Sequence, residues 1–151
     1  MIPSLGIHRL DDNIELPFYA TAASACFDLK AYIGPEDNGI LIEPGETVLV
    51  RTGLIFDIPK GYSIRLHPRS GLSLKSGIVL GNCEGIIDED YVEEVKIILY
   101  NRGSESFEVQ NGMKLCQGEM VYDLRANIIN IEEPPKQKTD RTGGFGSTGV
   151  K

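Results

Sequence analysis

The sequence predicts an all-β domain, a sandwich or barrel of short strands that carries one short helix. Short runs rich in β-branched and other apolar residues recur along the chain. Most of them are closed by a turn signal, and the chain holds 17 Gly and 8 Pro. Only one stretch has both the start and the stop signal of a helix. Regular short strands separated by Gly/Pro turns are typical of β-sandwiches and barrels.

The predicted strands follow one another at short intervals. Pro44-Gly45 separates the first two, and Pro59-Lys60-Gly61 closes the third. Asn111-Gly112 is a strong hairpin signal between the fifth and the sixth. In chain order, the predicted strands are Ile40–Ile42, Thr47–Arg51, Leu54–Ile58, Tyr62–Leu66, Ser106–Val109, Met113–Asp123 and Ile128–Ile131.

The one helical stretch is Ser70–Ser76. It begins with Ser70, a residue type that caps helices, and it ends before Gly77. The stretch is short, so we expect one or two turns that rest on the β body.

Bulk composition limits the class of protein. A chain of 151 residues with 41% hydrophobic residues suits one globular domain with a core. The net charge of −7 argues against a nucleic-acid-binding surface, which needs a basic stripe. The three cysteines are widely spaced with no C-x-x-C, so neither a disulfide framework nor a zinc site is expected. We see neither a signal peptide nor a run of about 18 apolar residues, and therefore expect a cytoplasmic protein with no membrane partner.

The stretch Gly81–Tyr91 has the densest chemistry in the chain. Ile78–Leu80 leads into it and Val92–Tyr100 follows, and these two β-rich runs predict a hairpin. Within the second run Val95, Ile97 and Leu99 alternate with Glu94, Lys96 and Ile98. Gly81 and Gly85 flank Asn82 and leave bare backbone that a planar ligand could approach.

Three adjacent acids, Asp88, Glu89 and Asp90, follow Ile86-Ile87, where a strand would be expected to continue. Like charges disfavour a strand, so we expect these acids to serve something outside the hairpin. The alternative is a solvated turn with an acidic end.

Three further stretches hold candidate site residues. Arg69 and Ser70 stand at the predicted helix start, where a guanidinium, a hydroxyl and free N–H groups could bind phosphate, or Arg69 could be an ordinary surface residue. Asp28 lies in a small and apolar run and is either a structural acid or a metal-holding one. If Cys116 faces the core, Gln117 faces outward and could orient a water or a phosphate oxygen, although a solvent-facing Gln is commoner.

The composition changes at Glu132. The segment Glu132–Lys138 has little to bury and is predicted to be an extended tether. The tail beyond it sets Phe145 among glycines, which could wrap an anion while the ring stacks on a base. Arg141 could clamp phosphates or simply pair with Asp140. We therefore expect a β body at residues 1–131 and a flexible C-terminal arm at 132–151 that closes as a lid, the alternative being a frayed terminus.

Taken in order, these places resemble the trimeric dUTP nucleotidohydrolases (dUTPases). The match covers nearly the whole chain. The matching stretches are A-C-F-D-L at Ala25–Leu29, P-R-S-G-L-S at Pro68–Ser73, G-N-x-x-G-x-I-D-x-D-Y at Gly81–Tyr91, G-x-x-x-x-Q at Gly112–Gln117, and the tail G-G-F-G-S-T-G.

The resemblance implies a jelly-roll-like homotrimer with active sites shared between subunits. It implies Mg²⁺-assisted attack of water on the α-phosphorus of dUTP, giving dUMP and pyrophosphate. Such an enzyme limits uracil incorporation into DNA and supplies dUMP for thymidylate synthesis. Asp28 would lie near the metal, through water. The implied catalytic residues are Asp88, Gln117 and Arg141. The implied substrate-binding residues are Arg69, Ser70, Gly71, Asn82, Gly85, Ile86, Ile87, Asp88, Tyr91, Lys96, Gln117, Arg141, Phe145, Gly146 and Ser147.

The resemblance also assigns roles within that set. Asp88 would orient the attacking water, and Tyr91 would pack under the deoxyribose. Lys96 would meet the base through its backbone. Two departures stand out: Val92-Glu93-Glu94 replaces a common R-G-E, and the Arg141–Phe145 spacing is one residue short. We interpret Glu93-Glu94 as a solvated strand face.

Other functions remain open at this point. A dCTP deaminase, or a bifunctional deaminase–dUTPase, would share the fold. A regulatory module that binds dUTP and signals to an unidentified protein partner belongs to another class, as does a purely structural β protein. The source, whether a cell, a virus or a phage acting in its host's cytoplasm, is not indicated.

Overall fold

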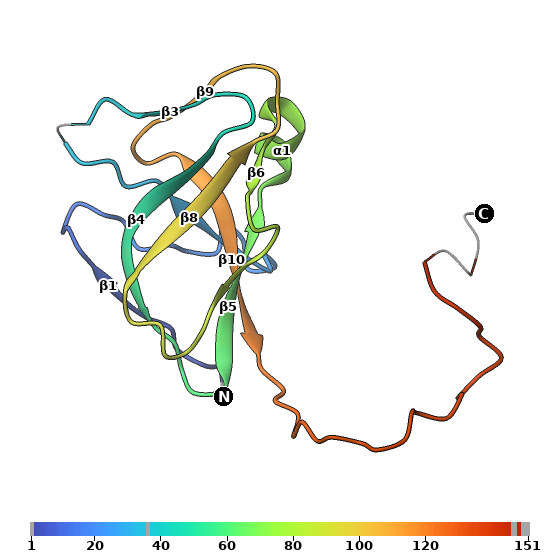
Figure 1. Cartoon of the computed structure of the whole chain (residues 1–151). Coiled ribbons are helices and arrows are strands. Elements are labelled where there is room, and N and C mark those ends of the chain that lie inside the picture. Colours follow the sequence, from blue (N-terminus) through green and yellow to red (C-terminus); the bar gives the residue numbers. More distant parts are fainter. Residues whose placement is uncertain (1, 36, 146–147, 149–151) are drawn as a thin grey trace.

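The computed structural model describes residues 2–35, 37–145 and 148. Its strands form two four-stranded sheets and a two-stranded ribbon, all antiparallel (Figure 1). The first sheet has the order β1 (Gly6–Arg9), β4 (Thr47–Asp57), β8 (Glu94–Asn101) and β6 (Ile78–Leu80). The second has the order β2 (Phe27–Lys30), β10 (Lys114–Tyr122), β5 (Tyr62–Pro68) and β7 (Gly85–Ile87). The ribbon pairs β3 (Ile40–Ile42) with β9 (Phe107–Val109), and the helix is α1 (Ser70–Ser76).

The core lies between the two sheets. Strand β8 shows how the sequence encodes it, because Val95, Ile97 and Leu99 are fully buried while the residues between them are not. Burial of each such side chain stabilises the fold by about 1.5–3 kcal/mol. The rings of Phe27 and Phe56, from opposite sheets, meet edge to face with centroids 6.4 Å apart. The predicted all-β fold with one short helix is therefore confirmed.

Strand β4 corrects the prediction of two separate strands at Thr47–Arg51 and Leu54–Ile58. The chain runs through both as one 11-residue strand, with a register shift between Arg51 and Ile55. Gly53 has φ +68° there, and its N–H donates to the Glu94 carboxylate at 2.9 Å. A β-bulge accommodates the extra residues without ending the strand.

The same bulge corrects the interpretation of Glu94. Its side chain is only 13% exposed, and its Oε2 lies 3.0 Å from Nε of Arg51. Glu94 is therefore a structural acid rather than part of a solvated face. Glu93 is exposed, as predicted.

The Asn111-Gly112 turn does not form the predicted hairpin. Strand β9 before it pairs with β3, whereas β10 after it pairs with β2 and β5. Gly112 has φ +78°, and its N–H donates to the carbonyl of Ala31. The turn therefore carries the chain from the ribbon to the second sheet.

The segment Ile128–Ile131 is not a strand, contrary to prediction. The chain leaves the body after β10 and runs outward (Figure 1). Ile128 is 94% exposed, because the described part of the chain offers it neither a partner strand nor an apolar surface. The short strands β1, β2 and β7 were not predicted from the sequence.

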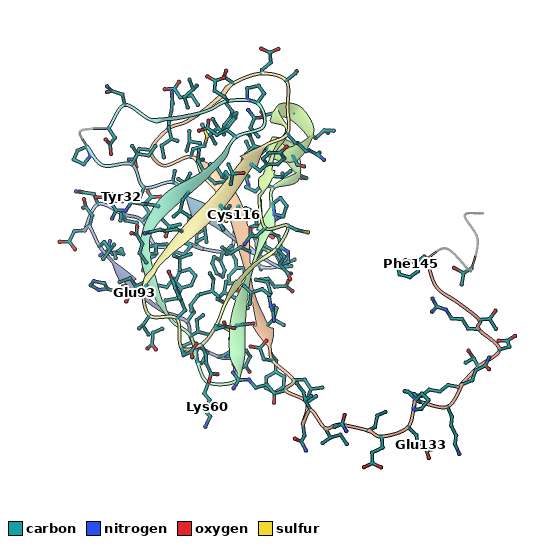
Figure 2. The ribbon with its side chains drawn as sticks, in the orientation of Figure 1. Tyr32, Lys60, Glu93, Cys116, Glu133 and Phe145 are labelled. Carbon is teal, nitrogen blue, oxygen red and sulfur yellow. The ribbon has the colours of Figure 1, made fainter. Side chains whose placement is uncertain are left out.

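The three cysteines differ sharply in environment. Cys116 is buried in the centre of the body (Figure 2), and burial, with a smaller effect of the Asp28 charge, raises its pKa to about 12. Burial, followed by Glu119 and Asp28, also raises the pKa of the half-buried Cys26. Cys83 is exposed.

We expect only Cys83 to react rapidly with a disulfide reagent at pH 8. The thiolate is the reactive form, and a raised pKa leaves Cys116 protonated at that pH. Counting released thiol before and after denaturation measures this. Cys83→Ser should abolish the fast phase, and a fast phase that persists in this variant would contradict the assignment.

Candidate active site

Three of the predicted site residues meet on the outer face of the second sheet. Gln117 on β10 is in register with Asp28 on β2. Because Cys116 is fully buried, its neighbour Gln117 faces outward, as the sequence predicted. Oδ1 of Asp28 lies 3.1 Å from Nε of Arg69, and Nε2 of Gln117 donates to the Pro68 carbonyl at 3.0 Å. The structure thus brings Asp28, Arg69 and Gln117 together.

Lys114 belongs to the same cluster, although sequence reasoning missed it. Its Nζ lies 2.9 Å from Oδ2 of Asp28, and its carbonyl accepts a hydrogen bond from Nη1 of Arg69 at 3.3 Å. In a regular strand Lys114 and Gln117 would face opposite sides. A bulge between Lys114 and Cys116 brings both to the outer face. The one sequence signal was the presence of Lys114 within the Gly112–Gln117 stretch.

Helix α1 begins directly after Arg69. The capping position is Arg69 itself, with an extended backbone, and it makes no side-chain cap bond. Ser70 is the first helical residue, so the prediction that it caps the helix is wrong. The N–H groups of Ser70 and Gly71 lie in the first turn, where a helix has no internal acceptor for them. The helix ends at Gly77, in the left-handed conformation with φ +69°, as the sequence predicted.

Strand β7 lies in the connection between the two strands of the predicted hairpin. Strand β6 does pair with β8, but the connection between them crosses to the second sheet, where Gly85–Ile87 pairs with β5. The prediction of a simple tight hairpin is therefore wrong. Within the described chain, β7 is an edge strand, so its outward main-chain groups have no strand partner. Such an edge can form hydrogen bonds with a planar amide-like ligand.

The two glycines of this stretch serve packing. A Cβ on Gly81 would lie 2.9 Å from Cγ2 of Ile98, and one on Gly85 would lie 2.9 Å from Cβ of Leu66. A side chain at either place would force the neighbouring residue to shift. The glycines therefore allow close packing of Ile98 and Leu66, and the approach of a planar ligand to their main chain stays a prediction.

The predicted site residues before and after β7 lie near the surface. Asn82, Asp88 and Lys96 are exposed. Tyr91 is 39% exposed, and its hydroxyl donates to the Glu94 carbonyl at 3.0 Å, which fixes the ring. Among the described residues, no hydrogen bond or ion pair joins this segment to the Asp28 cluster.

The arm, which includes Arg141, carries Phe145 away from the body (Figure 2). The Arg141 N–H donates to Oγ1 of Thr139, and the Arg141 carbonyl accepts a weak hydrogen bond from Gln137. No ion pair with Asp140 occurs in the described segment, and the Phe145 side chain is fully exposed. Within one chain, neither residue reaches the Asp28 cluster. Gly146 and Ser147 lie outside the described residues.

Comparison with known proteins decides the family. Residues 12–149 match the family model described as dUTPase. The chain belongs to the dUTPase family. A dUTPase is a hydrolase that cleaves a phosphoric anhydride.

Curated relatives agree with the dUTPase assignment over the whole length. A deoxyuridine 5'-triphosphate nucleotidohydrolase of Brucella melitensis biotype 2 is 45% identical, over 98% of this chain and 94% of the relative. One of Bartonella henselae is 42% identical, over 97% of this chain and 83% of the relative. One of Rhizobium meliloti is 43% identical, over 100% of this chain and 94% of the relative.

Solved dUTPase structures share the fold. A Staphylococcus bacteriophage 80alpha dUTPase mutant with dUpNHpp has a TM-score of 0.84 at 22% identity, over 99% of this chain and 100% of that one. A dUTPase mutant from phage phi11 of S. aureus, described with a structural Mg(II) ion, has a TM-score of 0.77 at 21% identity, over 89% of this chain and 100% of that one. In the described part of this dUTPase, no helix has the length and apolar character needed to cross a membrane.

Proposed function

We propose that this dUTPase hydrolyses dUTP to dUMP and pyrophosphate, with the phosphates received at the Asp28–Arg69–Gln117 cluster and the uracil read by the edge of β7. The observation that carries the proposal is the gathering of these three residues on one outer face, in a chain that matches the dUTPase family model over residues 12–149. Arg69 and Lys114 supply positive charge there, which an acidic protein needs in order to receive a triphosphate.

The cluster suits Mg²⁺ delivered with the substrate. Among the described residues there is no group of three or more His, Cys, Asp or Glu side chains that could enclose a metal. Mg²⁺ usually keeps several waters and binds one or two carboxylates together with substrate phosphates. Asp28 is one such carboxylate, directed at the cations of the cluster. When bound, the ion would offset phosphate charge and polarise the α-phosphorus.

The other roles, proton transfer, stabilisation of charge and substrate binding, fall to residues of the chain itself. Asp88 aligns a water and accepts its proton. Arg69 and Arg141 stabilise the charge that develops on the leaving pyrophosphate, while Ser70, Gly71 and Gln117 hold phosphate oxygens. The main chain of Gly85–Ile87 pairs with the uracil carbonyls, with Asn82 and the backbone of Lys96 alongside. Tyr91 packs under the deoxyribose, and Phe145, with Gly146 and Ser147, covers the base.

A homotrimer with shared sites fits these positions. As far as Phe145 the described arm runs away from its own body (Figure 1), and the Asp88 segment makes no described contact with the Asp28 cluster. A site assembled from several copies would unite them. We keep the division into a β body at 1–131 and a C-terminal arm and lid at 132–151, although regular strand structure already ends at Tyr122. We place the enzyme in the cytoplasm.

The test is pyrophosphate release from dUTP, dCTP and UTP, with and without a chelator. We expect dUTP to be cleaved far faster than the other two. The cytosine amino group would leave buried donors unpaired, and such mismatches can cost about 10⁴–10⁵-fold in discrimination. The chelator should remove most of the activity.

Other outcomes would contradict the proposal. Equal rates for the three nucleotides would refute the uracil and sugar assignments together. Ammonia release from dCTP would favour a deaminase, and dUTP binding without turnover would favour a regulatory module.

A further inference from the structure

Glu89 differs from the two acids beside it. Asp88 and Asp90 are exposed, whereas the Glu89 side chain is only 24% exposed. Oε2 of Glu89 accepts a hydrogen bond of 2.5 Å from the N–H of Gly61, and Oε1 lies 3.6 Å from Nη2 of Arg125. The sequence predicted that these acids serve something outside their own segment. For Glu89 the structure shows the partner, which is the turn between β4 and β5.

Gly61 is a firm anchor for this contact. It has φ +84°, and its carbonyl accepts the N–H of Asp123 at 2.9 Å. The Asp123 carboxylate in turn accepts hydrogen bonds from Oγ of Ser63 and Nη2 of Arg65, at 2.9 and 3.2 Å. Both main-chain groups of Gly61 are therefore occupied, one by Glu89 and the other by the first residue after β10.

The contact completes the restraint of Asp88 on both sides. Before it, Ile87 is paired with Ile64 across β7 and β5. After it, the Tyr91 N–H donates to the Asp88 carbonyl at 3.1 Å. Glu89 adds a charged hydrogen bond immediately next to Asp88, at the point where the sheet pairing ends. A displacement of about 1 Å at a reacting group can cost about 10²-fold in rate.

We propose that Glu89 is a positioning residue, which holds the turn bearing Asp88 in place by gripping the N–H of Gly61. The proposal rests on the proposed role of Asp88 as the base. Glu89 itself does not contact substrate. The ion pair with Arg125 is secondary, because the Arg125 side chain is 71% exposed and solvent-exposed pairs contribute little.

Two conservative variants separate the effect of side-chain length from the effect of charge. Glu89→Asp keeps the charge but is one methylene shorter, so it loses the Gly61 N–H. Its kcat for dUTP should fall by about 10- to 10²-fold with little change in KM. Glu89→Gln loses the charge but keeps an oxygen at the same distance from the main chain, and should retain most of the wild-type kcat. Glu93→Asp and Glu93→Gln, the matched controls at an exposed acid, should resemble wild type.

The outcomes are decisive when thermal unfolding shows that the variants are folded at the assay temperature. Wild-type kcat in Glu89→Asp, or an equal loss in Glu89→Gln, would overturn the proposal. In a chain that already carries Asp88→Asn, Glu89→Asp should cause no further loss, and an additive loss would also overturn it. Normal turnover in Asp88→Asn alone would instead refute the role of Asp88.

Discussion

Replacing Asp88 by Asn is expected to lower kcat for dUTP by about 10²–10⁴-fold, the usual contribution of a general base. An amide can still form hydrogen bonds with water but cannot accept its proton. Asp88 is exposed, so the substitution should leave the fold intact. Substrate binding should persist, because the groups proposed to hold uracil and phosphate are unchanged. Pyrophosphate release gives kcat, and calorimetry with a non-hydrolysable dUTP analogue gives the dissociation constant.

Glu93→Gln is the matched control for the loss of one negative charge. Glu93 is an exposed acid of the same segment with no proposed role in catalysis. The Glu93→Gln variant should retain the wild-type kcat. Near-normal turnover in Asp88→Asn would remove Asp88 from the mechanism, while a parallel loss of binding and turnover would point to a role in holding substrate.

Removing the residues after Lys138 is expected to have an effect of similar size. The truncation takes away Arg141 and Phe145, and loss of one group that stabilises developing charge usually costs about 10²–10³-fold in kcat. The body should be unaffected, because the Arg141 hydrogen bonds that the structure describes stay within the arm. Thermal unfolding should therefore be the same for the truncated and the full chain. Turnover of dUTP at the full rate by the truncated chain would show that the arm is no lid.

Single substitutions divide this effect between charge and ring. Arg141→Lys keeps a charge but loses the planar fork that binds phosphate through two parallel hydrogen bonds. Phe145→Leu keeps apolar bulk but loses the flat face needed for stacking. A loss confined to Arg141→Lys would assign the arm to the phosphates, and a loss confined to Phe145→Leu would assign it to the base.

Local sequence signals succeeded where neighbouring residues alone decide the structure. Helix α1 was predicted at its observed bounds, because Gly77 can adopt the left-handed conformation that ends a helix. The alternation of Val95, Ile97 and Leu99 predicted which face of β8 is buried. Asp28, Arg69 and Gln117 were each singled out from their surroundings, and the structure joins them.

Local signals failed wherever a distant strand decided the outcome. Asn111-Gly112 has the composition of a hairpin turn, but β3, β2 and β5 provide the partners of the strands on either side. The sequence did not indicate that Gly81 and Gly85 pack against Ile98 and Leu66, which belong to other strands. Glu94 was interpreted as a solvated acid, but at the bulge in β4 its carboxylate accepts a hydrogen bond from the Gly53 N–H.

By itself the sequence determined the all-β class, the short helix and most of the candidate site residues, because these depend on periodicity, turn residues and motif spacing within a few positions. The tertiary structure alone decided that Lys114 joins Asp28 and Arg69 and that Glu89 reaches Gly61. Both contacts depend on a bulge or on pairing between strands far apart in the chain. A one-dimensional pattern does not specify such pairings, since a shift of one residue in register turns every side chain of a strand to the opposite face.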